Sequence, residues 1–210
     1  MIPIRLLLLE DDECYRRRDG GSDTNDVRAA IRPETLRTWQ SEWDGADYGR
    51  WTHQLIPDVA VWLNRQHVEV DFFLTQILSG HGFFRKYLHK RGFASSAQCP
   101  ECGFEEQTAE HILFDCSRFE KARRETLEVA EVHLTVDNLV GEMCRNEHTW
   151  TAVYRLAQHT MSVLQQRCNE NKRRHVLAGG TGRSRLDPLA GTRPSRVRDA
   201  LPETDRRDAS

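Results

Sequence analysis

The stretch that decides the organisation of this chain is Cys99-Pro-Glu-Cys102-Gly-Phe-Glu-Glu-Gln-Thr-Ala-Glu-His111-Ile-Leu-Phe-Asp-Cys116, with the spacing C-x2-C-x8-H-x4-C. Two thiolates on a tight turn can hold one side of a tetrahedral Zn²⁺, and Gly103 permits the backbone reversal. Thr108 is placed to cap a short helix that carries His111, and Cys116 then completes the ligand set. Four protein ligands leave no position for a catalytic water. The spacing therefore predicts a structural zinc site whose metal binding also helps to fold this segment.

The other interpretation of these residues is a pair of free thiols beside a surface histidine, and it stays open at this level. The remaining cysteines, Cys14, Cys144 and Cys168, stand alone in the sequence. Cys144 and Cys168 lie in segments with helical spacing, where we expect small buried hydrophobic groups. Six cysteines placed so unevenly in a 210-residue chain favour a metal site over a disulfide framework.

Apolar residues around the cysteine region recur at helical spacing, so we expect a mainly α protein with the small CCHC zinc module embedded in a helical domain. The expected helices cover residues 34–43, 59–63, 72–78, 83–91, 117–132 and 148–171. Pro33 is placed at a helix start, Asp71 can cap another helix, and Ser117 with Glu120 fits a capping box. The longest helix carries an apolar stripe that needs a partner surface. Its members are Val153, Leu156, Ala157, Thr160, Met161, Leu164 and Cys168.

The two ends of the chain differ from its middle in composition. Residues 10–33 are charged and interrupted by glycine, so we expect irregular chain or a linker over 1–32. From Lys172 onward the chain is rich in Arg, Gly, Pro, Ser and Asp, and ordering it would cost more entropy than burial could offset. The sequence thus predicts a helical domain over 33–171, with the zinc module at 99–116, followed by a disordered basic tail over 172–210.

The overall charge predicts no partner, because 30 Lys and Arg nearly balance 32 Asp and Glu. Two local zones are basic, residues 82–98 with four cations and no acid, and residues 172–198 with eight cations and one acid. Such zones are compatible with a polyanion, although a solvated surface has the same pattern. The longest apolar run near the start, residues 6–9, is far too short for a membrane span or a signal peptide. We therefore expect an intracellular protein, nuclear or cytoplasmic, with no membrane partner.

The first basic zone interleaves aromatic residues with cations. Phe83, Phe84 and Tyr87 alternate with the candidate nucleic-acid contacts, which are Arg85, Lys86, Lys90 and Arg91. Cations can contact phosphates and aromatic faces can stack on bases. The alternative is an amphipathic helix that turns its aromatics to the core and its charges to water. We expect the aromatics to fill the core, and for the basic face both interpretations stay open.

Three stretches of the chain together carry a family resemblance. They are Gly49-Arg-Trp-Thr-His-Gln-Leu-Ile-Pro57, Phe73-Leu-Thr-Gln-Ile-Leu-Ser-Gly-His-Gly-Phe-Phe-Arg-Lys-Tyr-Leu-His89, and the cysteine region with Glu110-His-Ile-Leu-Phe-Asp-Cys116. Over residues 32–167 the chain closely resembles the carboxyl-terminal region of reverse transcriptases from arthropod non-LTR retrotransposons. In that family one open reading frame encodes an endonuclease, a reverse transcriptase and this CCHC region. The resemblance implies that the metal ligands are Cys99, Cys102, His111 and Cys116.

The parent family is an RNA-directed DNA polymerase with an endonuclease, but we expect neither catalytic centre and no catalytic residue in this chain. About 30 residues precede the resemblance, and Leu9-Glu-Asp-Asp12 lacks the aromatic residue that opens the polymerase's paired-aspartate motif. We expect a solvated acidic loop there, and no small-molecule substrate.

Two functions remain. The leading hypothesis is an accessory domain that contacts RNA or DNA during target-primed reverse transcription. The alternative is a structural or protein-interaction module that packs on a reverse transcriptase core, which exposed Trp39, Trp43 or Trp62 would favour.

Overall fold

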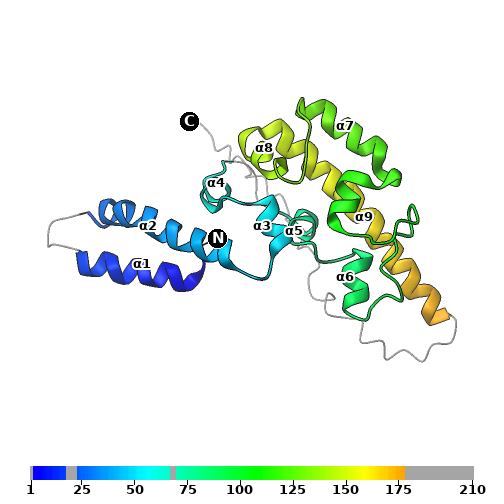
Figure 1. Cartoon of the computed structure of the whole chain (residues 1–210), viewed down its shortest axis with the longest axis horizontal. Helices are drawn as coiled ribbons and strands as arrows, with labels where there is room; N and C mark the ends of the chain where they lie inside the picture. Colours follow the sequence, from blue (N-terminus) through cyan, green and yellow to red (C-terminus); the bar gives the residue numbers. More distant parts are fainter. Residues whose placement is uncertain (1, 18–22, 67–69, 178–210) are drawn as a thin grey trace, which may run out of the picture.

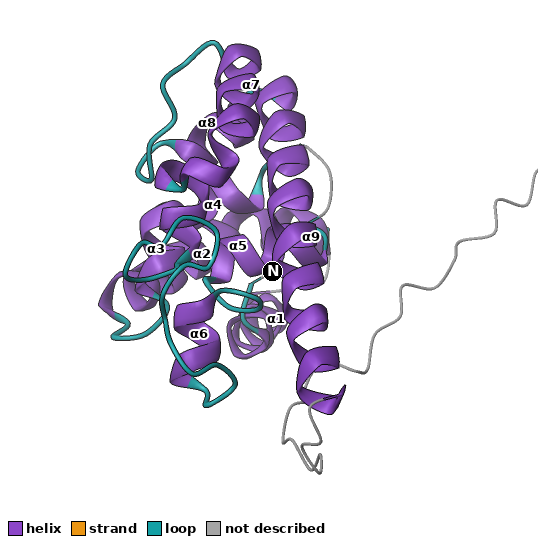
Figure 2. Ribbon diagram, turned by 90° about the vertical axis from the view of Figure 1, so that its right-hand side faces the viewer, coloured by secondary structure: helices purple, strands orange, loops and turns teal. Residues whose placement is uncertain are grey.

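The computed structural model describes residues 2–17, 23–66 and 70–177, with side chains as far as Arg174. These described residues form helices and no strand, which confirms the mainly α prediction (Figures 1 and 2). None of the helices in this part of the chain is long and apolar enough to cross a membrane.

The long helix α9 (Glu147–Leu177) is the element on which the core is built. The helices α5 (Phe72–Ser79), α7 (Glu120–Ala130) and α8 (Leu139–Arg145) pack against it (Figure 2). The predicted apolar stripe faces these partners and is buried from Val153 to Leu164, whereas Cys168 is half-buried. The hydroxyl of Thr160 avoids an unpaired burial because it donates to the Leu156 carbonyl at 2.8 Å.

Three short helices complete the body: α3 (Arg50–Leu55), α4 (Val59–Leu63) and α6 (Arg85–Lys90). The helix α5 begins as predicted, because the Asp71 carboxylate accepts a hydrogen bond from the Leu74 amide at 2.8 Å. It ends at Gly80, whose φ of +69° is the left-handed conformation typical of helix termination.

The tryptophans that would have marked an orphaned interface are not exposed. Trp39, Trp43 and Trp62 are each half-buried. The Trp43 indole donates to the Ile56 carbonyl at 2.8 Å, and the Trp62 ring stacks on Trp150 with centroids 6.0 Å apart. These three tryptophans therefore do not form the exposed surface that would favour an interaction module.

The prediction of irregular chain over residues 1–32 is wrong for the described part of that segment. The helices α1 (Ile4–Arg17) and α2 (Thr24–Gly45) form an antiparallel hairpin that extends from the body (Figure 1). The charges that hid the helical pattern are paired: the Glu10 carboxylate, 1% exposed, lies 2.8 Å from Arg32. Asp11 and Asp12 lie on α1 and not in a loop, and they pair with Arg28 and Arg16 respectively.

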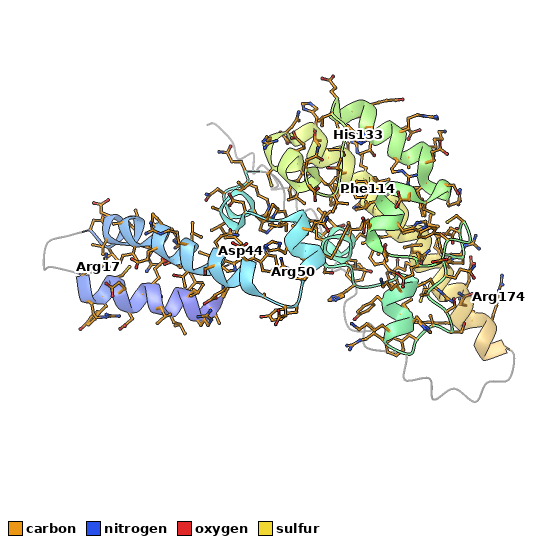
Figure 3. The ribbon with its side chains drawn as sticks, in the orientation of Figure 1. Arg17, Asp44, Arg50, Phe114, His133 and Arg174 are labelled. Carbon is orange, nitrogen blue, oxygen red and sulfur yellow. The ribbon has the colours of Figure 1, made fainter. Side chains whose placement is uncertain are left out.

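The hairpin joins the body where α2 meets α3. Arg50 lies beside Asp44 at this junction (Figure 3), and its guanidinium donates to the Asp44 carbonyl at 3.2 Å. His53 approaches the Asp44 carboxylate at 2.9 Å. The hydrogen bond to His53 holds the pKa of Asp44 below its usual value.

Two predicted helix starts differ from the structure, and one predicted end lies further along. Pro33 lies inside α2, which begins nine residues earlier at Thr24 behind an Asp23 cap. No side-chain cap forms at Ser117 or Glu120, because residues 117–119 make a separate 3-10 turn (η2, Ser117–Phe119) before α7. The helix α9 continues past 171 to Leu177, and residues 178–210 of the predicted tail lie outside the described residues.

Candidate metal centre and the adjoining basic cavity

The first half of the centre is the tight turn between the two leading cysteines. The Gly103 amide donates to the Cys99 carbonyl at 2.8 Å, and the Cys99 amide donates to the Phe104 carbonyl at 2.8 Å. Gly103 has a φ of +82°, although nothing lies within 4 Å of where its Cβ would stand. The glycine is therefore required for its backbone conformation and not for space, as the sequence predicted.

The second half is a widened helical turn, the π-helix η1 (His111–Asp115). The helical residues 109–110 lead into η1, and the predicted cap precedes them, because the His111 amide donates to the Thr108 hydroxyl at 3.0 Å. The turn η1 closes with a hydrogen bond from the Cys116 amide to the His111 carbonyl at 2.7 Å, five residues apart. In an α-helix, residues five apart point about 140° away from each other, so the wider turn helps to bring Cys116 back beside His111.

The four predicted ligands converge. Their donor atoms all lie within 4.8 Å of one another. The Sγ atoms of Cys99 and Cys116 are 4.0 Å apart, and Cys102 Sγ is 3.2 Å from Nε2 of His111. Tetrahedral zinc with bonds of about 2.3 Å to sulfur would place two thiolates about 3.8 Å apart. The cluster thus has the donor set and the dimensions of a closed Cys3His metal site.

The environment prepares these groups differently for a metal. Burial lowers the pKa of His111, so its imidazole is neutral and its lone pair is available at neutral pH. Burial raises the pKa of the Cys116 thiol to about 12. Burial also acts to raise the pKa of Cys102, but hydrogen bonds to its sulfur, from the Phe104 backbone first, together lower it. A metal must therefore displace a firmly held proton from Cys116.

Phe104 orients the histidine. Its ring is 55% exposed and stacks on His111, with centroids 4.7 Å apart and planes 7° from parallel. The Nδ1 atom of His111 is buried and makes no hydrogen bond within the described part of the chain. Ring stacking thus takes the orienting role that a second-shell hydrogen bond performs in many metal sites.

Gln107 is a site residue that sequence reasoning missed. It is 1% exposed and its Nε2 atom donates to Cys99 Sγ at 3.3 Å. Its Oε1 atom accepts from the Arg85 amide at 3.1 Å, and its carbonyl accepts from the Lys86 amide at 3.2 Å. One glutamine therefore joins the cysteine cluster to the first turn of α6. In the sequence Gln107 is only a polar residue between the Cys99–Cys102 pair and the His111–Cys116 pair. That position alone does not predict that its side chain is buried.

The four predicted nucleic-acid contacts separate into two groups. Lys86 forms an exposed ion pair with Glu106 at 2.6 Å. Arg85, Lys90 and Arg91 instead line a cavity of about 700 Å³. The prediction that the neighbouring aromatics fill the core is confirmed for Phe84, which is fully buried, while Phe83 and Tyr87 are half-buried.

This cavity, which we call the basic cavity, lies between α5, α6, the first cysteine turn and the carboxyl-terminal half of α9. Figure 2 shows α6 beside the lower part of α9. The lining cations are Arg85, Lys90, Arg91, Arg167 and Lys172, and the lining rings are Phe72, His81, Phe83, Tyr87 and Phe93. Among the described lining residues the one acid is Glu101, whose side chain is 2% exposed and lies 3.2 Å from Arg167. Sequence reasoning missed Arg167, because its distance from residue 85 along the chain hides their proximity.

Comparison with known proteins gives a consistent result. Residues 49–122 match a family model described as zinc-binding in reverse transcriptase. The chain is 33% identical over 140 residues to the retrovirus-related Pol polyprotein from type-1 retrotransposable element R1 4 of Nasonia vitripennis, covering 60% of this chain and 36% of that protein.

Two further relatives carry similar names. The chain is 32% identical over 126 residues to the R1 element Pol polyprotein of Popillia japonica, covering 58% of this chain and 48% of that protein. It is 30% identical over 103 residues to the R1 element Pol polyprotein of Bradysia coprophila, covering 49% of this chain and 10% of that protein. The chain thus spans between a tenth and about half of the length of these curated relatives. No solved structure matches it.

Proposed function

We propose that this chain, which contains a zinc-binding region related to that of retrotransposon reverse transcriptases, is an accessory domain that binds nucleic acid. The observation that carries the proposal is the convergence of Cys99, Cys102, His111 and Cys116 beside the basic cavity. In a longer polyprotein the domain would help to hold RNA or target DNA during target-primed reverse transcription, inside the cell.

The metal in this proposal is Zn²⁺ with a structural role. Three thiolates and one imidazole form a donor set typical of structural zinc, and four ligands fill its tetrahedron. Cys99, His111 and Cys116 are buried, so the bound ion would contact water only beside the exposed Cys102. Through Gln107 the ion would also hold the first turn of α6.

Nucleic acid is the partner because cations gather without matching acids. The residues that the structure places around the basic cavity include five cations and one acid, and that acid is already paired with Arg167. Lys90 and Arg91 are exposed and form no ion pair within the part of the chain that the structure describes. Such groups can neutralise phosphates and release condensed counterions.

A structural or protein-interaction module remains the second candidate, and a specific observation favours it. The helix α1 exposes large apolar side chains, with Ile4 at 72%, Leu8 at 62% and Tyr15 at 79%. Exposed apolar surface of this kind often marks a protein interface. A reverse transcriptase core is the partner that the similarity to Pol polyproteins suggests.

Filter binding of the zinc-loaded full chain tests the proposal against single-stranded RNA, single-stranded DNA and duplex DNA at two salt concentrations. The variant Lys90→Ala/Arg91→Ala should bind less tightly, and its salt slope should fall by about 1.4 to 1.8 if both contacts are lost. The matched control is Lys121→Ala/Arg124→Ala on the exposed face of α7. Equal affinities and slopes for wild type and both variants would move the preference to the interaction module.

A further inference from the structure

We propose that the basic cavity is a binding site for unpaired nucleotides, with bases inside the cavity and phosphates at its cationic rim. This inference rests on the proposed function and adds the substrate class, which is a single-stranded segment or a frayed end.

Aromatic rings line the basic cavity. His81 and Tyr87 lie with centroids 4.7 Å apart, and Phe72 packs edge-on to Phe83 at 6.3 Å. Phe72 is 46% exposed, so an aromatic face remains available at the cavity. Every base has a π-face that can stack on such rings. In a duplex that face is covered by the neighbouring base pair, so only an unpaired base can enter.

Two residues of the cavity lining carry buried donors without acceptors in the described part of the chain. The Nε atom of Arg85 and the Nε2 atom of Gln76 are buried and have no hydrogen-bond partner among the described residues. Both residues line the cavity. Buried donors without acceptors are uncommon in folded proteins, and each one calls for an explanation such as a bound water or ion. Carbonyl oxygens and ring nitrogens of a base, or a phosphate oxygen, are acceptors that would satisfy these donors.

The size of the basic cavity and the charges at its rim also fit nucleotides. A volume of about 700 Å³ lies within the range of about 300 to 1,000 Å³ that is usual for ligand sites. The cavity is lined by exposed cations from two elements: Lys90 and Arg91 at the end of α6, and Lys172 on α9. A strand whose bases enter the cavity would therefore meet cations from both elements. A blunt duplex would contact the same cations but leave the interior empty.

Cys168 supplies a reporter inside the cavity. This half-buried thiol is one of the lining residues, whereas Cys144, also half-buried, is not. We would measure the modification rate of each thiol by N-ethylmaleimide with peptide mass spectrometry, on the zinc-loaded full chain. The probes are a ten-nucleotide oligouridylate, a ten-nucleotide oligothymidylate and a blunt ten-base-pair duplex.

The expected result is at least about tenfold slower modification of Cys168 with a saturating single strand, and little change with the duplex. The rate at Cys144 should not change with any probe. Whichever single strand protects at the lower concentration identifies RNA or DNA as the preferred source of the unpaired nucleotide.

Two variants keep the test independent of labelling. Phe72→Ala removes an exposed ring, and Tyr87→Leu keeps much of the apolar bulk without the ring. Each should weaken single-strand binding by about 5- to 150-fold, the usual loss for one base on an aromatic ring, and leave duplex binding unchanged. Circular dichroism and zinc content confirm that each variant is folded.

The outcomes separate the inference from the function on which it rests. Nucleic-acid binding with unprotected Cys168 and unchanged affinity in both variants would overturn the cavity site and leave the proposed function standing. Absence of binding to any of the three probes at low salt would overturn both.

Discussion

Replacing Gln107 by methionine tests whether the cysteine cluster and α6 are energetically joined. Methionine has a similar length and can fill the same buried space, but it cannot donate to Cys99 Sγ, and its thioether accepts poorly from the Arg85 amide. The two side-chain hydrogen bonds that disappear measure 3.3 and 3.1 Å. Because the Arg85 amide loses its acceptor, the change combines lost hydrogen bonds with an unsatisfied donor.

The magnitude follows from these two losses. A hydrogen bond contributes about 1 kcal/mol, and an unsatisfied buried donor costs about 1–3 kcal/mol, so zinc-loaded stability should fall by about 2–4 kcal/mol. Loss of an outer-shell hydrogen bond to a ligand typically lowers metal affinity by about 10- to 100-fold. We expect zinc affinity of Gln107→Met to decrease within that range, and nucleic-acid affinity to decrease with it because α6 is less well held.

The assay is competition for zinc with a chromophoric chelator, together with urea unfolding of the zinc-loaded protein. The matched control is Gln98→Met, because Gln98 belongs to the same module but is exposed, and its side chain donates to the Gly103 carbonyl at 3.1 Å and not to a cysteine. This control should change stability by no more than about 0.5 kcal/mol. If Gln107→Met binds zinc as tightly as Gln98→Met, the glutamine does not support the centre and the reasoning is refuted.

Three further predictions concern the centre and the core. Because burial raises the pKa of Cys116 to about 12, zinc must displace a proton there. Apparent zinc affinity should therefore rise by at least about one log unit per pH unit from pH 6 to 8. A flat profile in the chelator competition would contradict this. Gly103→Ala should lower the free energy of unfolding by about 1–2 kcal/mol, because this residue has a left-handed backbone conformation. The control Gly45→Ala lies in a helix with open space around it and should not lower it. A melting temperature of Gly103→Ala equal to that of Gly45→Ala would refute this. Met161→Ala should cost about 2–5 kcal/mol in urea unfolding, since the side chain is fully buried on α9, and a loss below 1 kcal/mol would mean that this core repacks.

Local patterns in the sequence predicted several features correctly. Asp71 caps α5 and Thr108 caps the turn of His111, because a cap depends only on residues two or three positions away. The buried stripe of α9 follows from helical periodicity in the same way. Over an 18-residue segment, the cysteine spacing was likewise enough to predict which four side chains converge.

The errors arose where distant residues decide local structure. Glu10 and Arg32 belong to the charged segment that was predicted to be irregular, but they pair across the α1–α2 hairpin. The capping-box pattern at Ser117 is local, yet the turn that brings Cys116 beside His111 leads into a 3-10 turn instead. A local preference worth about 1 kcal/mol yields to such packing constraints.

The sequence by itself determined the convergence of the three cysteines and His111, and the apolar face of the longest helix, because both depend on separations of a few residues along the chain. Only the tertiary structure decided that Gln107 joins this cluster to α6, and that Phe72 and Lys172 line one cavity. These residues meet because several amphipathic helices bury their apolar faces together around α9. That collective burial depends on how whole elements fit one another, and no short stretch of sequence carries the information.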